Sequence, residues 1–204
     1  MTGGADFLLV LALMLPVSGA VAMFASPLRP SQRIAFVTLG LRLAVAMAIA
    51  VAVGRGGQAL FYAVGNWAPP LGLALRADGT SAALMVVAAV LLCLVGWSAG
   101  PSLCTPKGEP DRRAAFAFWG LLMAVWSALN LVLMAQDLFT IFVAMELLTF
   151  AAVPLASLSG SAETMRAALR YLLVSLAGAG FYLFGTALFY ARAGALDIRT
   201  LRAL

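Results

Sequence analysis

The sequence contains no histidine, and its only cysteines are Cys93 and Cys104. The absence of histidine removes the usual axial ligand of haem, the commonest zinc ligand and the side chain most used for acid–base chemistry near neutral pH. One cysteine lies in an apolar run and the other in a loop, so they provide neither metal-ligand spacing nor a disulfide framework. We therefore expect no cofactor in this chain, and proton transfer would have to use carboxylates, basic groups and water.

Charge is also scarce. Charged residues make up 10% of the chain and hydrophobic residues 64%, and the mean hydropathy is +1.03. These values lie outside the range of soluble globular domains, so the composition predicts an integral membrane protein in a lipid bilayer. Basic residues outnumber acidic ones by 13 to 8, but no basic block is long enough to bind nucleic acid.

Long hydrophobic runs fill most of the sequence. A membrane-spanning helix needs roughly 20 mainly apolar residues, and six such runs occur, at about residues 5–25, 34–53, 80–98, 114–134, 138–158 and 167–190. They leave no room for a soluble domain. We predict an all-α integral membrane protein, a single membrane domain over residues 1–204 built as a bundle of about six transmembrane helices. Between the second and third runs, the alternating "LGLALRAD" predicts a short hairpin.

Basic residues in the loops predict the orientation of the helices. Three loops that alternate along the chain carry Arg29 with Arg33, Lys107 with Arg112 and Arg113, and Arg166. By the positive-inside rule these loops are cytoplasmic, which places the N-terminus outside. The opposite side also carries arginines, namely Arg55, Arg76, Arg192, Arg199 and Arg202.

Glu146 lies eight residues into the fifth predicted helix, roughly 12 Å deep. A charged carboxylate at such a depth costs on the order of 2.5 to 3.5 kcal/mol, so the group should face the protein interior, hold a proton or pair with a cation. Desolvation raises the pKa of a carboxyl group and a nearby cation lowers it, so a moving cation would load and unload a proton. The alternative is a buried hydrogen-bonding anchor between helices.

Arginine is the candidate partner for this acid. Arg170 should lie roughly 13 Å from the cytoplasmic side and Glu146 roughly 18 Å, a difference within reach of an arginine side chain. The alternative is that Arg170 extends to cytoplasmic headgroups. For Arg42, eight residues into the second predicted helix, no acid lies opposite at a matching depth. We expect its guanidinium to snorkel to the membrane surface.

Four further features surround these charges. Asp137 is predicted to cap the fifth helix. Pro154 removes a backbone hydrogen bond, so it should kink that helix or admit water beyond the acid. Asn130 adds a polar side chain to the fourth helix, and "SLAGAG", residues 175–180, would let the sixth helix approach a neighbour closely.

Three stretches resemble one known family: "GNWAPPLGLALRADGTSA", "DLFTIFVAMELLTF" and "AALRYLLVSLAGAGFYLFGTALFYARAGALDI". They are similar to the N-terminal half of the antiporter-like membrane subunits. That family includes the proton-pumping subunits of NADH:quinone oxidoreductase (complex I), the D-type component of Mrp-type sodium/proton antiporters, and membrane hydrogenase subunits. The resemblance covers nearly the whole chain and is strongest over residues 65–82 and 137–198.

The resemblance implies a proton-translocating subunit in which Glu146 belongs to the ion pathway. Family members usually carry lysine in an "ALKY" pattern, whereas this chain reads "ALRY" with Arg170. Because a guanidinium stays charged, Arg170 would be an electrostatic modulator rather than a proton carrier. A lysine on the family's seventh helix has no counterpart within residues 1–204. Members have about twice as many helices, arranged as inverted repeats, so the chain would hold the first helices of such a subunit, as a fragment or a split form.

The leading hypothesis is a bacterial inner-membrane subunit that moves protons, or exchanges protons for sodium, together with other membrane subunits. No nucleophile–base pair or metal set is present, so any enzymatic activity would belong to the surrounding complex, of the NADH:quinone oxidoreductase or hydrogenase type. The alternative is a structural or assembly subunit without an ion pathway of its own.

Overall fold

The computed structural model describes residues 6–25, 31–66, 72–103 and 113–202. Within these residues, six helices are long and apolar enough to cross a membrane. They are α1 (Phe7–Ala25), α2 (Ser31–Gly56), α3 (Gly79–Ala99), α4 (Arg113–Met134), α5 (Leu138–Ala156) and α6 (Ala162–Ala193). The predicted all-α membrane fold is confirmed. The loop residues Arg29, Cys104, Lys107 and Arg112 lie outside the described residues.

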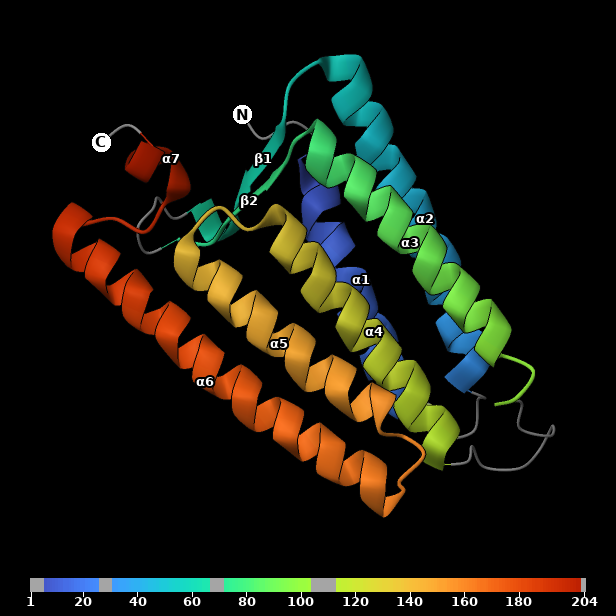
Figure 1. Ribbon diagram of the computed structural model, residues 1–204. Helices are drawn as coiled ribbons and strands as arrows, with labels where there is room; N and C mark the ends of the chain where they lie inside the picture. The colour runs from blue at the N-terminus through green and yellow to red at the C-terminus, as the bar shows by residue number, and fades with distance from the viewer. Residues whose placement is uncertain (1–5, 26–30, 67–71, 104–112, 203–204) are drawn as a thin grey trace.

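The helices run side by side in an alternating up-and-down order (Figure 1). Helix α4 is the centre of the bundle, because it packs against α1, α2, α3 and α5. Helices α1, α2 and α3 form one flank through α1–α2 and α2–α3 contacts, and α6 packs mainly on α5 at the other flank. The bundle therefore has a well-packed side and a side that ends in a single exposed helix.

The loop between α2 and α3 contains the predicted hairpin. Strand β1 (Leu60–Ala63) pairs with β2 (Ala74–Ala77) in antiparallel fashion, with Leu60 opposite Ala77, and a short helical turn, η1 (Val64–Asn66), follows β1. The alternating "LGLALRAD" supplies β2, whereas its partner strand β1 comes from residues earlier in the same α2–α3 loop. Leu75 is fully buried and bridges Ala135, so the hairpin covers the end of α4.

Two helices are longer than their apolar runs. Helix α2 begins at Ser31 instead of near residue 34, and α6 begins after Ser161, whose hydroxyl accepts a hydrogen bond from the Thr164 N–H. A cap of this kind satisfies a free N–H group and lets polar residues form the first turn. With 32 residues, α6 is about 48 Å long, well beyond a hydrocarbon core of about 30 Å.

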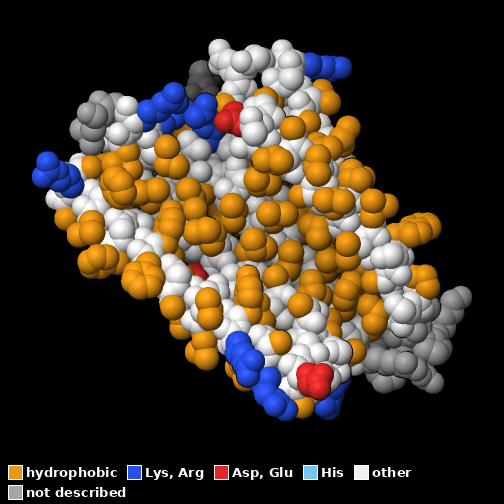
Figure 2. Space-filling view, in the orientation of Figure 1, with side chains coloured by type: hydrophobic (Ala, Val, Ile, Leu, Met, Phe, Trp, Pro, Cys, Tyr) orange, Lys and Arg blue, Asp and Glu red, His pale blue; other side chains and the backbone are white. Residues whose placement is uncertain are grey.

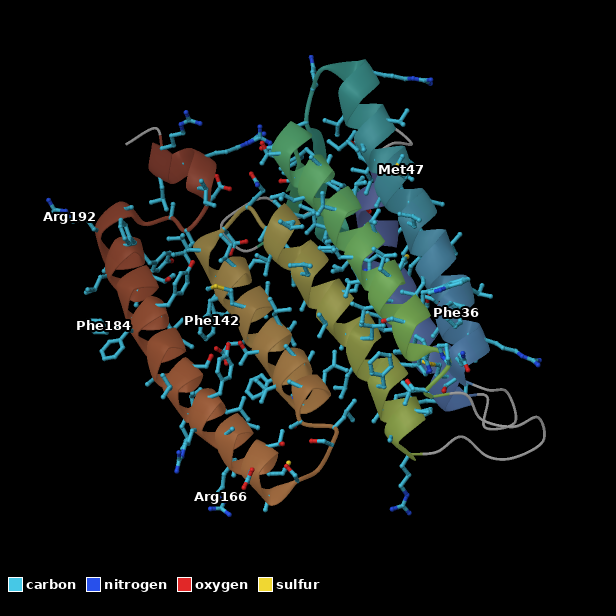
Figure 3. The ribbon with its side chains drawn as sticks, turned by 45° about the vertical axis from the view of Figure 1, so that its right-hand side comes forward. Phe36, Met47, Phe142, Arg166, Phe184 and Arg192 are labelled. Atoms are coloured by element: carbon cyan, nitrogen blue, oxygen red, sulfur yellow. The ribbon has the colours of Figure 1, made fainter. Side chains whose placement is uncertain are left out.

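Charge and apolar surface are separated as a membrane requires. Figure 2 shows hydrophobic side chains over the middle of the visible face and basic side chains gathered toward its two ends. In Figure 3, Arg166 and Arg192 lie at opposite ends of α6. The chain between α6 and the short helix α7 (Ile198–Arg202) returns to the α4–α5 loop, where the Leu138 N–H donates to the Leu196 carbonyl at 3.1 Å.

The core divides into two apolar clusters along the bundle. One lies at the hairpin end and includes Leu9, Ile49, Met85 and Met134; the other includes Leu39, Trp119, Met123 and Trp126. Both clusters draw on α1, α2, α3 and α4 and neither has a fully buried member from α6. The burial that stabilises the fold is therefore concentrated on the flank away from α6.

Candidate functional site

Glu146 lies near the middle of α5, about 12 Å along the axis from Leu138 and about 15 Å from Ala156. Its side chain is partly buried and lines a cavity of about 110 Å³ between α5 and α6. The other lining residues are Thr149 and Phe150 of α5 and Leu169, Leu172, Leu173, Ser175 and Leu176 of α6. Of the surroundings expected for this acid, the structure gives a partly buried position that faces α6, with two hydroxyl groups lining the same cavity.

The spacing of residues along both helices explains this cavity. Glu146 and Thr149 are three residues apart, so they share one face of α5. On α6, Leu169, Leu172, Leu173 and Leu176 repeat at helical spacing and form the facing wall. The carboxyl group thus lies in a mainly apolar space whose nearest polar side chains are hydroxyls, which can donate or accept a hydrogen bond.

Contacts nearer the start of α5 fix the two helices beside each other. The Phe142 and Tyr182 rings stack at 6.3 Å between centroids with 14° between their planes, and the Tyr182 hydroxyl donates to the Leu138 carbonyl at 3.2 Å. Figure 3 shows Phe142 on the side of α5 that faces α6, and Phe184 pointing outward from the bundle. These contacts set the α5–α6 spacing one turn before Glu146.

The structure does not bring Arg170 into this cavity. Arg170 is exposed and is absent from the cavity lining, although Leu169 is part of it. One residue corresponds to about 100° around a helix, which turns Arg170 toward the uncovered side of α6. Among the described residues, the expected Glu146–Arg170 ion pair is not formed.

Asp137 has the capping position predicted for it. Its carboxylate accepts a hydrogen bond from the Thr140 N–H at 2.7 Å and another from the Thr140 hydroxyl. Pro154 lies in the last turn of α5, which ends two residues later. Because proline has no N–H, the Phe150 carbonyl lacks its regular donor. Phe150 lies one turn beyond Glu146 and lines the same cavity.

Asn130 lies away from the Glu146 cavity, and the glycines of the small-residue stretch make no close contact. Asn130 is buried on the α1 side of α4, where its Nδ2 donates to the Ala12 carbonyl at 2.9 Å, so it ties α4 to α1 rather than lining the Glu146 cavity. The close approach expected for the stretch 175–180 is not seen at its two glycines in the described structure. A side-chain carbon added at Gly178 or Gly180 would meet nothing within 4 Å.

Arg42 corrects a second expectation. Its side chain is 2% exposed, and the guanidinium lies 3.9 Å from the centre of the Trp126 ring instead of reaching the membrane surface. Two features explain this position: the depth of Arg42 along α2 and the aromatic ring beside it. Because α2 starts at Ser31, Arg42 is about 17 Å from the start of the helix, too far for a side chain to span, and the Trp126 face attracts a cation.

Sequence reasoning missed three side chains. Thr149 could have been predicted from the sequence, since it follows Glu146 by three residues and so lies on the same face of the helix. Ser175 and Trp126 could not, because each becomes relevant only through the packing of a second helix, of α6 on α5 for Ser175 and of α2 on α4 for Trp126.

Comparison with known proteins shows what this chain is similar to. The family model described as "NADH:quinone oxidoreductase/Mrp antiporter, TM" matches residues 135–204, which include Asp137, Glu146 and Arg170. The D-type component of a probable K(+)/H(+) antiporter of Rhizobium meliloti is 29% identical over 98% of this chain and 37% of its own length. The chain is homologous to antiporter-like membrane subunits. The N-type component of the NADH-quinone oxidoreductase of Desulforudis audaxviator is another such relative, 33% identical over 72% of this chain and 28% of its own length.

Solved antiporter-like structures share the fold. A chain of the Mrp complex from Dietzia sp. DQ12-45-1b superposes with a TM-score of 0.80 at 25% identity, over 95% of this chain and 36% of that one. A chain of the membrane-bound sulfane sulfur reductase, an archaeal respiratory membrane complex, gives a TM-score of 0.83 at 23% identity, over 96% of this chain and 39% of that one. The present chain spans about a third of the length of these antiporter-like relatives.

Proposed function

We propose that this chain forms the first part of a proton-translocating or cation/proton antiport subunit, and that Glu146 carries the proton. The observation that carries the proposal is the position of this one acid, at the middle of a membrane-spanning helix and in a helix–helix cavity. The homology to antiporter-like subunits supports the same function.

The cavity suits proton transfer by a carboxyl group. A water molecule needs about 10–15 Å³ of such space, so a cavity of about 110 Å³ has room for several beside Glu146. Hydroxyl groups such as those of Thr149 and Ser175 are able to hydrogen-bond to either protonation state of a carboxyl group. The cavity thereby accommodates both the neutral and the ionised acid, which a proton carrier must alternate between.

Arg170 acts on Glu146 through its field in this proposal. A guanidinium remains charged, so it carries no proton. The longer relatives contain further protein outside the segment that matches this chain, and the uncovered side of α6 is where such protein would pack. Covering that side would place Arg170 in a less polar medium, where its charge acts more strongly on Glu146.

The same proposal covers location and partners. The chain lies in the bacterial inner membrane with its N-terminus outside, as the basic loops favour. Other membrane subunits of a complex I-like or Mrp-type assembly contact it. Protons are the transported ion, with sodium or another cation exchanged where the complex is an antiporter.

Replacing Glu146 tests the function. We expect Glu146→Gln, in the intact complex in vesicles, to abolish most proton movement while the amount of assembled complex stays unchanged, because glutamine fills the same space but carries no proton. Glu163→Gln is the matched control, since Glu163 is an exposed acid in the first turn of α6. Undiminished proton movement in the Glu146→Gln complex contradicts the proposal. A lower amount of complex with an unchanged rate per complex favours the structural alternative.

A further inference from the structure

Arg42 presents hydrogen-bond donors that no described protein group accepts. Its Nε, Nη1 and Nη2 atoms are all buried without a hydrogen-bond partner among the described residues, and the Trp126 ring covers one face of the guanidinium. The group lies about 17 Å along α2, close to the middle of the membrane. A guanidinium keeps its proton even here, so the charge stays in place.

The contact with Trp126 is insufficient for this charge. A cation–π contact satisfies the face of the guanidinium, whereas its five N–H bonds point outward in the plane. Ionised groups at the middle of a membrane normally pair with one another or face a water-filled space. No described acid makes an ion pair with Arg42, which leaves hydrogen-bond acceptors other than carboxylates.

A second polar atom lies one turn from Trp126. Asn130 is 4% exposed, its Nδ2 is bonded to the Ala12 carbonyl, and its Oδ1 is buried without a donor among the described residues. Residues 126 and 130 occupy the same face of α4. Unused donors on α2 therefore lie beside the face of α4 that holds an unused acceptor, and water can satisfy both because it donates and accepts.

We propose that Arg42 and Asn130 hold internal water molecules among α1, α2 and α4, and that the fixed charge of Arg42 keeps this hydrated site closed to protons and cations. Helix α4 packs against both α2 and α5. The water site is on its α2 side and is independent of the function assigned to Glu146. A fixed arginine beside pore water is an electrostatic barrier to positive ions. The internal water therefore does not conduct protons or cations across the membrane.

Hydroxyl-radical labelling tests the hydration. Radicals generated from bound water by a short X-ray pulse oxidise side chains that touch that water. Trp126 and Met85 are each 1% exposed, and Met85 lies in the apolar cluster at the hairpin end. In the intact complex, we expect several-fold more oxidation at Trp126 than at Met85. Oxidation at Trp126 no higher than at Met85 overturns the proposal, and this comparison requires no variant.

Two substitutions distinguish the hydration of the site from the effect of the Arg42 charge. Arg42→Met removes both and should lower Trp126 oxidation to the Met85 level, with assembly retained because a buried charge is replaced by an apolar side chain of similar length. Arg42→Gln retains polar atoms but no charge, so Trp126 should stay labelled while passive proton leak into proteoliposomes rises several-fold. Unchanged leak in Arg42→Gln, with labelling retained, overturns the barrier role. Glu163→Gln, at an exposed acid in the first turn of α6, should alter neither measurement.

Discussion

Glu146 and Arg42 each place an ionisable group within a membrane-spanning helix, and their surroundings give them opposite properties. Glu146 is partly buried beside two hydroxyls in a cavity with room for water. These surroundings are the ones that the proposed proton-carrying role requires. Arg42 is 2% exposed against an aromatic ring and keeps its charge under all physiological conditions. One residue is suited to carry protons, and the other to repel them.

Substitutions of Arg170 distinguish a modulating charge from a proton carrier. We expect Arg170→Lys to retain most proton movement, because the positive charge remains. Arg170→Gln should lower the rate about tenfold, which corresponds to about 1.4 kcal/mol of lost electrostatic stabilisation. Proton movement per assembled complex is the measurement. Equal rates for wild type and Arg170→Gln would show that this charge does not act on the pathway.

Asp78, at the start of α3, links stability to pH. The pKa of its carboxyl group is lowered, chiefly because the carboxylate accepts a hydrogen bond from the Ser81 N–H at 2.9 Å. The unfolded chain binds that proton more readily, with a pKa of about 3.9. The contribution of the cap is therefore complete well above this value and declines as the pH falls through the lower folded pKa.

Asp78→Asn removes this titration, because asparagine can cap a helix without ionising. We expect the difference in Tm between wild type and Asp78→Asn to be constant above about pH 5 and to shrink toward lower pH. Thermal unfolding of the purified protein in detergent measures it. A difference that does not change with pH would contradict the role of ionisation.

At the scale of elements, the crossing of α1 and α2 depends on one glycine. A side-chain carbon at Gly19 would lie 2.7 Å from Thr38 Oγ1 and 2.8 Å from its Cγ2. Thr38 cannot turn away freely, since its hydroxyl donates to the Ile34 carbonyl at 2.8 Å. We expect Gly19→Ala to lower the free energy of unfolding by about 1–3 kcal/mol through overpacking.

Gly40→Ala is the matched control for that change. Gly40 lies on α2, where an added carbon would meet nothing within 4 Å, so alanine should be neutral or slightly stabilising through its helix propensity. Thermal unfolding of both variants in the same detergent measures the difference. Equal stability of the two variants would mean that α1 and α2 move apart to accommodate the added carbon without lowering the free energy of unfolding.

The elements themselves were predictable from sequence because lipid imposes length and composition on each helix. The Asp137 cap was also predictable, since its interaction is local. The direction in which a helical side chain points was not, because it depends on rotation about the helix axis and on the partner helix. For this reason the sequence left several surroundings open for Glu146, and the expected surroundings of Arg42 and of the glycines at 178 and 180 differ from those in the structure.

At the scale of the whole molecule, stability and proposed function occupy different flanks. The buried clusters draw mainly on α1 to α4, with Ala144 from α5, whereas Glu146 faces α6. Among the described residues of α6, Thr186 alone is buried. The α5–α6 pair is thus held to the bundle through α4, and its outer side is free to contact the further protein of the longer relatives. A proton site at such a boundary would respond to movement of that protein without disturbing the core.

The even number of crossings makes the orientation testable. The start of α1 and helix α7 lie at the same end of the bundle (Figure 1), and Arg166 and Arg192 lie at opposite ends of α6 (Figure 3). In a background with both native cysteines replaced by serine, we expect an impermeant maleimide to label Arg192→Cys in intact spheroplasts. Arg166→Cys should be labelled only in inverted vesicles, because the more basic loops remain cytoplasmic. The reverse pattern would invert the proposed direction of the proton path while leaving the fold and the Glu146 cavity unchanged.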